Sequence, residues 1–290
     1  ALLAQAVTHL PSNVSKVRGG GRWNQHAMGS CCKRLVEQWR KERAEVQLLN
    51  EGKWVEVFGS SSNRCLKDWL AFSAFRLVLA FIITAILCFD VHGDARMGVA
   101  DCYLVYLSRW VLLSQVLYFW LAFGTAWRVG LMASGVVPKA ERMPLYVKAT
   151  WVVQDITLPA AVLASSLFWT CVVPFKQSHI DTRSYFTHGV DAVLVILDMA
   201  VSRQPYYLRH AANVGIVLVV YVLFTLSYYA AGGTDCRGHR SIYKLLDWGH
   251  PWTTALLVGP VVVGAPSLNF LFWFMISQCF PRTYQDDIPA

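Results

Sequence analysis

The sequence predicts an all-α polytopic membrane protein, a bundle of about six transmembrane helices with both termini in the cytoplasm. Of its 290 residues, 55% are hydrophobic and only 15% are charged, and its mean hydropathy is +0.39. A soluble domain has about 25% charged residues, so this chain lacks the polar surface that a water-soluble globule needs. Length alone would allow one or two soluble domains, but composition argues against them.

Six stretches after residue 68 are long and apolar enough to cross a bilayer, which needs about 20 mainly apolar residues per helix. They are Trp69–Phe89, Cys102–Gly124, Tyr146–Val173, Tyr185–Val201, Ala211–Ala231 and Trp252–Cys279. The third and sixth are long and contain Pro159, Pro260 and Pro266, so we expect them to tilt or kink. Helix is the required conformation because lipid satisfies no backbone group, and the alternation of barrel strands is absent.

Lysine and arginine are unevenly distributed between the two sides of these stretches. In residues 28–290, fifteen lysines and arginines lie on the side of the N-terminus: before the first stretch, between the second and third, between the fourth and fifth, and in the tail. Six lie on the opposite side. The positive-inside rule therefore places both termini in the cytoplasm. The net charge of +8 then reflects topology, with a secondary attraction to anionic lipid. We expect membrane lipids as partners and no nucleic acid, because no basic surface remains outside short loops.

Residues 1–27 contain no signal-peptide hydrophobic region and no coherent periodicity. We expect Met28 to be the natural start and residues 1–27 to be an upstream, non-native segment. Gly29 would then be open to myristoylation, and Cys31 and Cys32 to palmitoylation, the alternative being two ordinary reduced thiols. The rest divides into a cytoplasmic N-terminal region, a six-helix transmembrane domain and a cytoplasmic tail, at residues 28–68, 69–280 and 281–290.

Ionisable side chains within spans are costly and are expected to face the bundle interior. Their depths in the membrane follow from their distance along the helix to the end of each predicted span, at about 1.5 Å per residue, and these depths divide them into two layers. The inner layer contains Arg76, Asp155 and Asp198, and the outer layer contains Ser108, Arg109, His188 and Asp191. His188, Asp191 and Asp198 share one helix face, so a stripe of the fourth span is predicted to face the core. Each layer is interpreted either as part of a polar cavity, reactive at its outer end, or as a contact that holds helices together. We favour the structural interpretation for the inner layer and leave both open for the outer.

Cysteine and histidine spacing predicts little metal or redox chemistry. Cys102, Cys171 and Cys236 lie at or beyond the outer ends of spans, where at most one disulfide is expected and its partners stay open. His239 and His250 are close in sequence, but no ligand spacing supports a metal site. We therefore expect neither a metal nor a cofactor.

The loop before the sixth span has a distinctive composition. Gly232-Gly233 is expected to end a helix and to permit positive φ. An amphipathic pattern with aromatic anchors follows, suited to lying at the membrane interface. Its apolar members are Ile242, Tyr243, Leu245, Leu246 and Trp248.

The order of the spans and several motifs form a recognisable pattern over residues 65–280. His188-Gly189 opens the fourth span, Gln204-Pro205 closes it with His210 beyond, and the last loop reads Tyr-Tyr-x-x-Gly-Gly-Thr-Asp and then Ile-Tyr-x-x-Leu-Asp-Trp. This pattern resembles the rolling stone-like membrane proteins, and the loop is its most specific part. The resemblance implies a protein of the plasma membrane or an endomembrane that supports membrane interaction or myoblast-type cell fusion in development.

That family is distantly similar to the androgen-induced and androgen-dependent transmembrane hydrolases of fatty-acid esters, which use an intramembrane Thr nucleophile with a His. Matching Leu107-Ser108 and Gln115 places Ser108 at the nucleophile. Matching His188-Gly189 places Asp191 at the catalytic His, so the base is a carboxylate in this chain. His188, one turn earlier, is the substitute base, with Asp191 as its orienting partner.

Three functions follow from these observations. The leading hypothesis is a non-enzymatic multi-pass protein that supports membrane interaction or cell fusion. The alternative is an intramembrane serine hydrolase that takes a lipid ester into the bundle and uses Ser108, His188 and Asp191. The third is a small-solute transporter with the charged layers as gates, although no inverted repeat or pair of broken helices is evident.

Overall fold

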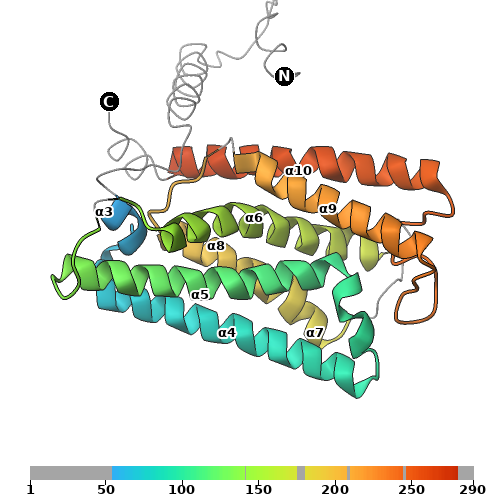
Figure 1. Ribbon diagram of the computed structural model, residues 1–290, viewed down its shortest axis with the longest axis horizontal. Helices are drawn as coiled ribbons and strands as arrows, with labels where there is room; N and C mark the ends of the chain where they lie inside the picture. The colour runs from blue at the N-terminus through green and yellow to red at the C-terminus, as the bar shows by residue number, and fades with distance from the viewer. Residues whose placement is uncertain (1–53, 141, 175–179, 208–209, 244–245, 280–290) are drawn as a thin grey trace, which may run out of the picture. The chain divides into compact units, whose positions relative to one another are not determined.

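Figure 1 shows a computed structural model of the chain, which describes residues 54–140, 142–174, 180–207, 210–243 and 246–279. The predictions for Gly29, Cys31 and Cys32, for residues 1–27 and for the tail at 281–290 lie outside these residues. All long elements of the described part are helices, and six of them are long and apolar enough to cross a membrane. The all-helical class and the number and order of the predicted spans are therefore confirmed, whereas the second helix runs over Leu107–Ala133 and not over the predicted Cys102–Gly124.

The long elements follow the predicted order along the chain. They are α4 (Trp69–Arg96), α5 (Leu107–Ala133), α6 (Leu145–Leu167) continued by the π-helix η3 (Phe168–Val172), α7 (Thr182–Tyr185) continued by the π-helix η4 (Phe186–Val190) and α8 (Asp191–Val201), α9 (Ala211–Ala230) and α10 (Pro251–Cys279). Three short elements accompany them, namely α3 (Trp54–Gly59), η1 (Arg64–Leu66) and η2 (Ala100–Val105).

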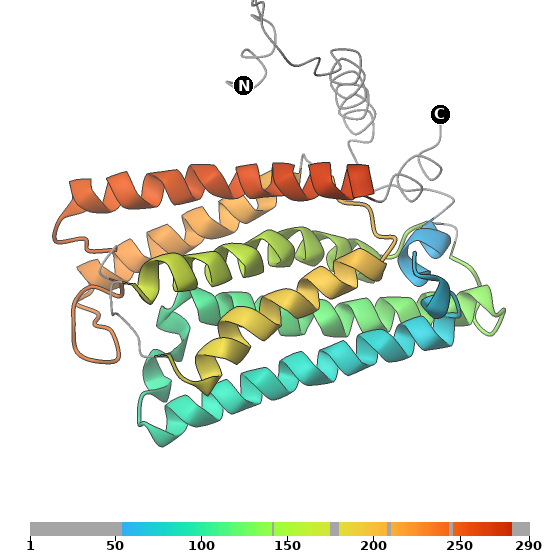
Figure 2. The ribbon, with the colours of Figure 1, turned by 180° about the vertical axis from the view of Figure 1, so that it is seen from behind.

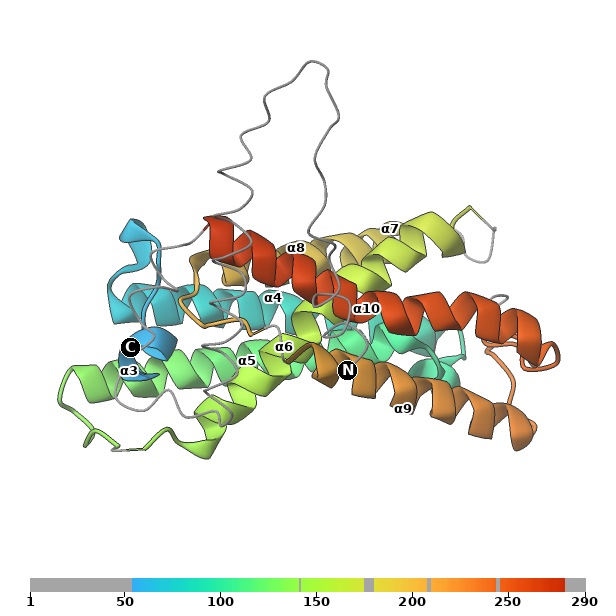
Figure 3. The ribbon, with the colours of Figure 1, turned by 90° about the horizontal axis from the view of Figure 1, so that it is seen from above.

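The helices pack as three pairs. α4 lies against α5 on one side, α9 lies against α10 on the other, and α6 with α8 fills the middle (Figures 1 and 2). The view from above shows α10 crossing over this middle pair (Figure 3). We name the two ends of the bundle the Trp69 end and the Arg96 end, after the first and last residues of α4. Because α8 lies in the middle, Asp191 and Asp198 of the fourth span lie in the interior of the bundle.

The Trp69 end is closed by aromatic and aliphatic packing. The side chains of α3 pack against α5, the start of α6 and the chain after α8 in one buried cluster. Its largest members are Trp54, Phe58 and Trp151, with Phe58 and Trp151 in edge-to-face contact at 5.4 Å between ring centroids. Burial of such rings contributes about 1.5–3 kcal/mol each, so α3 anchors the approach to the first span.

The first span is longer than its apolar stretch. Asp68 begins α4 by accepting a hydrogen bond from the Ala71 amide at 3.2 Å, which satisfies an otherwise free helix N–H. The helix then continues past Phe89 to Arg96, because Asp90 and Asp94 find ion partners in the protein. The helix therefore extends seven residues beyond the predicted apolar stretch, and this extension carries charged groups that the hydropathy pattern omitted.

The described residues of the loop after α9, 231–243 and 246–250, pack against the Arg96 end of the bundle, whereas Leu245 of the predicted amphipathic pattern lies outside the described residues. Gly232 adopts the expected positive φ of 82°. Ile242 and Leu246 are buried, the Tyr243 hydroxyl accepts a hydrogen bond from the Leu107 amide at 3.2 Å, and the Trp248 indole donates to Thr225. The apolar side of the pattern faces protein because α5 and α9 offer it both contacts and hydrogen-bond partners.

Candidate functional site

A buried arginine and a buried aspartate hold three helices together in the half of the bundle nearer the Trp69 end. Arg76 of α4 donates to both carboxylate oxygens of Asp198 of α8, at 3.0 and 3.2 Å, and both side chains are 0% exposed. Arg76 also donates to the Ser202 hydroxyl and to the Ala122 carbonyl, and the Tyr118 hydroxyl donates to Asp198. We call Arg76, Tyr118, Asp198 and Ser202 the Arg76 cluster. Every polar atom of the Arg76 guanidinium has a partner, so this cluster is a closed contact.

Asp155, predicted in the same layer as Arg76, has a different partner. Its carboxylate pairs with the His210 imidazole at the start of α9, and the Trp151 ring packs on that imidazole at 5.4 Å. Asp155 is fully buried and its second oxygen has no hydrogen-bond partner among the described residues. Of the residues predicted for the inner layer, Arg76 and Asp198 therefore form one pair, and Asp155 forms another with His210 at the start of α9.

Arg109 pairs with α4 and not with Asp191. Its guanidinium forms ion pairs with Asp90 and Asp94, and Arg183 of α7 joins them by an ion pair with Asp94 at 2.9 Å. We call Asp90, Asp94, Arg109 and Arg183 the outer cluster. It ties α4, α5 and α7 together at the Arg96 end, so the ionic partners of Arg109 lie on α4 and not among the other members of its predicted layer.

Tyr103 and Asp181 lie beside the outer cluster, and their shifted pKa values keep each in the protonation state that binds the cluster. Burial, and then the charge of Asp94, raises the pKa of Tyr103, so this residue stays protonated and donates to Asp90 at 2.8 Å. Burial opposes ionisation of Asp181, but hydrogen bonds from Ser184 outweigh it, and the pKa of Asp181 is lowered. Asp181 therefore keeps its charge at neutral pH, caps α7 and pairs with Arg183 at 3.2 Å.

The three residues of the expected hydrolytic triad are not joined. Asp191 is 3% exposed and accepts a hydrogen bond from the Gln115 amide at 3.0 Å. The His188 ring stacks on Phe168 at 3.9 Å, and its buried Nδ1 has no partner. Within the described residues, no hydrogen bond links half-buried Ser108 to either of them. The fourth span does turn Asp191 and Asp198 inward, as its spacing predicts.

His188 lies where two π-helical turns meet. The Trp169 indole of η3 donates to the His188 carbonyl of η4 at 2.7 Å, and the Phe168 ring of η3 covers the imidazole. Turns of π-helix interrupt regular helices and are frequent at functional positions. Here the wider turns are stabilised by contacts between the two helices, and no sequence signal indicated them.

The outer surface of the Arg96 end is held by one disulfide. Cys102 of η2 is bonded to Cys236 of the loop after α9, with 5.7 Å between the Cα atoms, and Cys171 is free. The sequence left this choice open among three cysteines. His239 pairs with Asp235, and the hydrogen bond from His250 lowers the pKa of the Asp247 carboxyl. Among the described residues no group of three ligands could hold a metal ion.

The fold and its buried ion pairs define an integral membrane protein with several spans. A sequence model of the family described as "Protein rolling stone" matches residues 103–283, more than half of the chain, and the chain belongs to this family. The protein named "Protein rolling stone" from Drosophila melanogaster is 30% identical over 106 residues, which are 36% of this chain and 38% of that protein. The match thus spans less than half the length of that relative. No solved structure matches the chain.

Proposed function

We propose that this protein is a non-enzymatic membrane protein that supports the interaction and fusion of cell membranes, as in myoblast-type fusion. The observation that carries the proposal is the closed Arg76 cluster, in which charges deep in the bundle bind one another and are fully buried. Breaking such a pair strands a charge, so it fixes the positions of helices and offers no group for reaction. Membership of the rolling stone family supports the same function.

The proposal assigns the interaction with another membrane to the Arg96 end. The positive-inside rule places the opposite, Trp69 end in the cytoplasm, so the Arg96 end would face away from it. This end presents residues 231–243 of the loop after α9, which the Cys102–Cys236 disulfide ties to η2. A segment tied in this way binds a partner at a lower cost in conformational entropy than a free one.

The disulfide provides the test of this function. In fusion-competent cells that depend on the expressed full-length chain, we expect Cys102→Ser with Cys236→Ser to lower the fraction of multinucleated cells several-fold, because the loop loses its attachment. Fusion is scored at equal surface amounts of protein. Cys171→Ser removes a free cysteine at the same end and is expected to match wild type. Normal fusion by the double variant would contradict the proposal.

A lipid-ester hydrolase is the second candidate, favoured by one observation. The buried atoms His188 Nδ1, Asp191 Oδ1 and Gln115 Oε1 have no hydrogen-bond partners among the described residues, although buried polar atoms are nearly always paired. A bound substrate or water would supply the missing partners. The candidate then requires Ser108 to reach His188 when substrate binds.

A fluorophosphonate lipid probe distinguishes the two candidates. The purified chain in liposomes is expected not to react at Ser108, because no base activates its hydroxyl. The measurement is covalent labelling detected by mass spectrometry, with an intramembrane serine hydrolase as positive control. Labelling that is lost in both Ser108→Ala and His188→Ala would establish the hydrolase and refute the non-enzymatic proposal.

A further inference from the structure

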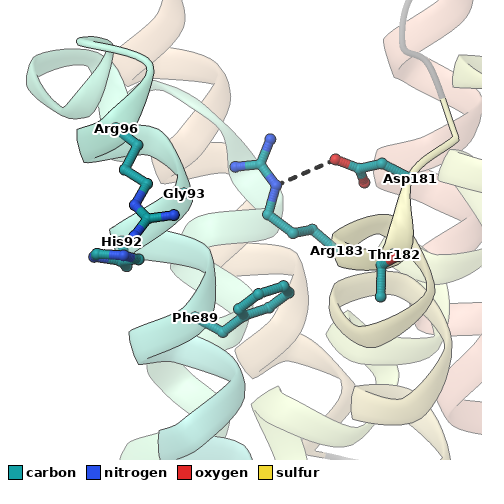
Figure 4. Close-up of a pocket in the computed structure, with 7 residues that line it drawn as sticks. All are labelled: Phe89, His92, Gly93, Arg96, Asp181, Thr182 and Arg183. Carbon is teal, nitrogen blue, oxygen red and sulfur yellow. Dashed lines mark hydrogen bonds and ion pairs between the residues drawn. The ribbon is translucent and has the colours of Figure 1, made fainter.

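A pocket of about 300 Å³ lies between the last turns of α4 and the start of α7. It is lined by Phe89, His92, Gly93, Arg96, Asp181, Thr182 and Arg183. In Figure 4 the α4 residues His92 and Arg96 stand on one side, Asp181 and Thr182 stand on the other, and the Phe89 ring lies below. A methyl group at Gly93 would approach the Arg183 Nη1 atom to 2.4 Å. The absence of a side chain there thus allows Arg183 to lie directly against α4.

The depth of this pocket corresponds to the headgroup layer of a bilayer. The hydrocarbon core is about 30 Å thick, which about 20 helical residues span at 1.5 Å each. Counted from Trp69, that length ends near Phe89, whose side chain is 46% exposed. The remaining turns of α4, with His92 and Arg96, then extend into the polar layer. The pocket therefore has hydrocarbon beside its floor and headgroups beside its opening.

The charges of the pocket leave one positive group without a partner. Arg183 is held by Asp181 at 3.2 Å and by Asp94 at 2.9 Å. No hydrogen bond or ion pair joins the exposed Arg96 side chain to any other described residue. Asp181 and Asp94 thus compensate the charge of Arg183, and Arg96 is the lining cation that is left for an anionic ligand. A phosphodiester carries one negative charge and accepts charge-assisted hydrogen bonds from arginine.

We infer that this pocket binds the phosphodiester headgroup of a phospholipid in the leaflet at the Arg96 end. Arg96 and His92 bind the phosphate, Arg183 is held in place by its two aspartates as the opposite wall, and Phe89 contacts the start of an acyl chain. The occupant is a lipid and not a free phosphate compound, because half of the Phe89 surface is otherwise exposed at the edge of the hydrocarbon. This lipid site is independent of whether the protein acts in cell fusion.

The test measures lipid binding by the purified full-length chain. The protein is exchanged into lipid-free detergent, titrated with dioleoylphosphatidylcholine, and the bound lipid is counted by native mass spectrometry. We expect Arg96→Gln to weaken binding about tenfold, the effect of losing one charge-assisted hydrogen bond. His92→Gln is expected to weaken it less, and Arg96→Lys is expected to retain most of the affinity because the charge is kept.

Three controls make the result decisive. Arg142→Gln removes an exposed arginine outside the pocket and is expected to bind like wild type. Dioleoylglycerol lacks the phosphate and glycerophosphocholine lacks the acyl chains, so both are expected to bind at least tenfold more weakly than the intact lipid. Because Arg96 is exposed, its Gln variant should melt at the wild-type temperature in lipid-free detergent. Equal binding by Arg96→Gln and wild type, or equal binding of either truncated compound, would overturn the inference.

Discussion

Replacing Arg76 by leucine is expected to lower the free energy of unfolding by about 3–5 kcal/mol, the cost of removing one partner of a buried ion pair. The change leaves the Asp198 carboxylate at 0% exposure with the Tyr118 hydroxyl as its remaining side-chain donor among the described residues. This donor carries no positive charge. The stability is measured by unfolding the purified chain in mixed micelles with increasing denaturant.

Replacing Arg76 and Asp198 together tests whether the loss of stability comes from their ion pair or from any substitution in this region. Arg76→Leu with Asp198→Leu removes both charges, and we expect it to be more stable than either single variant, since well-packed apolar residues often replace a buried pair with little loss. Arg142→Leu, at an exposed arginine, is expected to change stability by less than about 0.5 kcal/mol. If the double variant lost as much as the sum of the single ones, the two side chains would not be coupled in the folded protein.

Replacing Arg109 by leucine is expected to cost about 3 kcal/mol, near the lower limit for a buried pair because the Arg109 side chain is 17% exposed. The loss leaves Asp90 buried without its cation, whereas Asp94 keeps Arg183. The same unfolding titration measures it, and the added change Asp90→Leu should restore most of the lost stability.

Asp191→Leu serves as the matched control for the Arg109 pair. Asp191 is equally buried but its partner is Gln115, so adding Asp191→Leu to Arg109→Leu should give no restoration. Restoration by Asp191→Leu and not by Asp90→Leu would show that Arg109 faces the fourth span, and the outer cluster would then be wrong.

Hydropathy predicted the number and order of the spans because apolar length is what a bilayer selects. The inward direction of Asp191 and Asp198 was also predictable, since residues seven apart on a helix share a face whatever surrounds it. The end of the first helix was not predictable from apolar length, because Asp90 and Asp94 continue the helix with charges that distant residues compensate. Two carboxylates four residues apart, directly after an apolar stretch, were the available signal for this extension.

Pairing between helices could not be derived from depth alone. Counting along the predicted spans placed Arg109 at a depth similar to that of Asp191, yet Arg109 binds α4, and Asp155 binds His210 of α9. Each choice depends on how far a helix is rotated about its axis and on which helix is its neighbour, and both are set by packing of the whole bundle. For the same reason the sequence left the disulfide open among three cysteines, while the fold joins Cys102 to Cys236.

The most direct test of a non-catalytic interior is the fusion activity of Ser108→Ala in cells that depend on the expressed chain. This change removes only a hydroxyl that has no hydrogen bond to His188 or Asp191 in the described part of the chain. Our account predicts the wild-type fraction of multinucleated cells at the wild-type surface amount. A fall to the level of cells without the protein, at an unchanged surface amount, would contradict it.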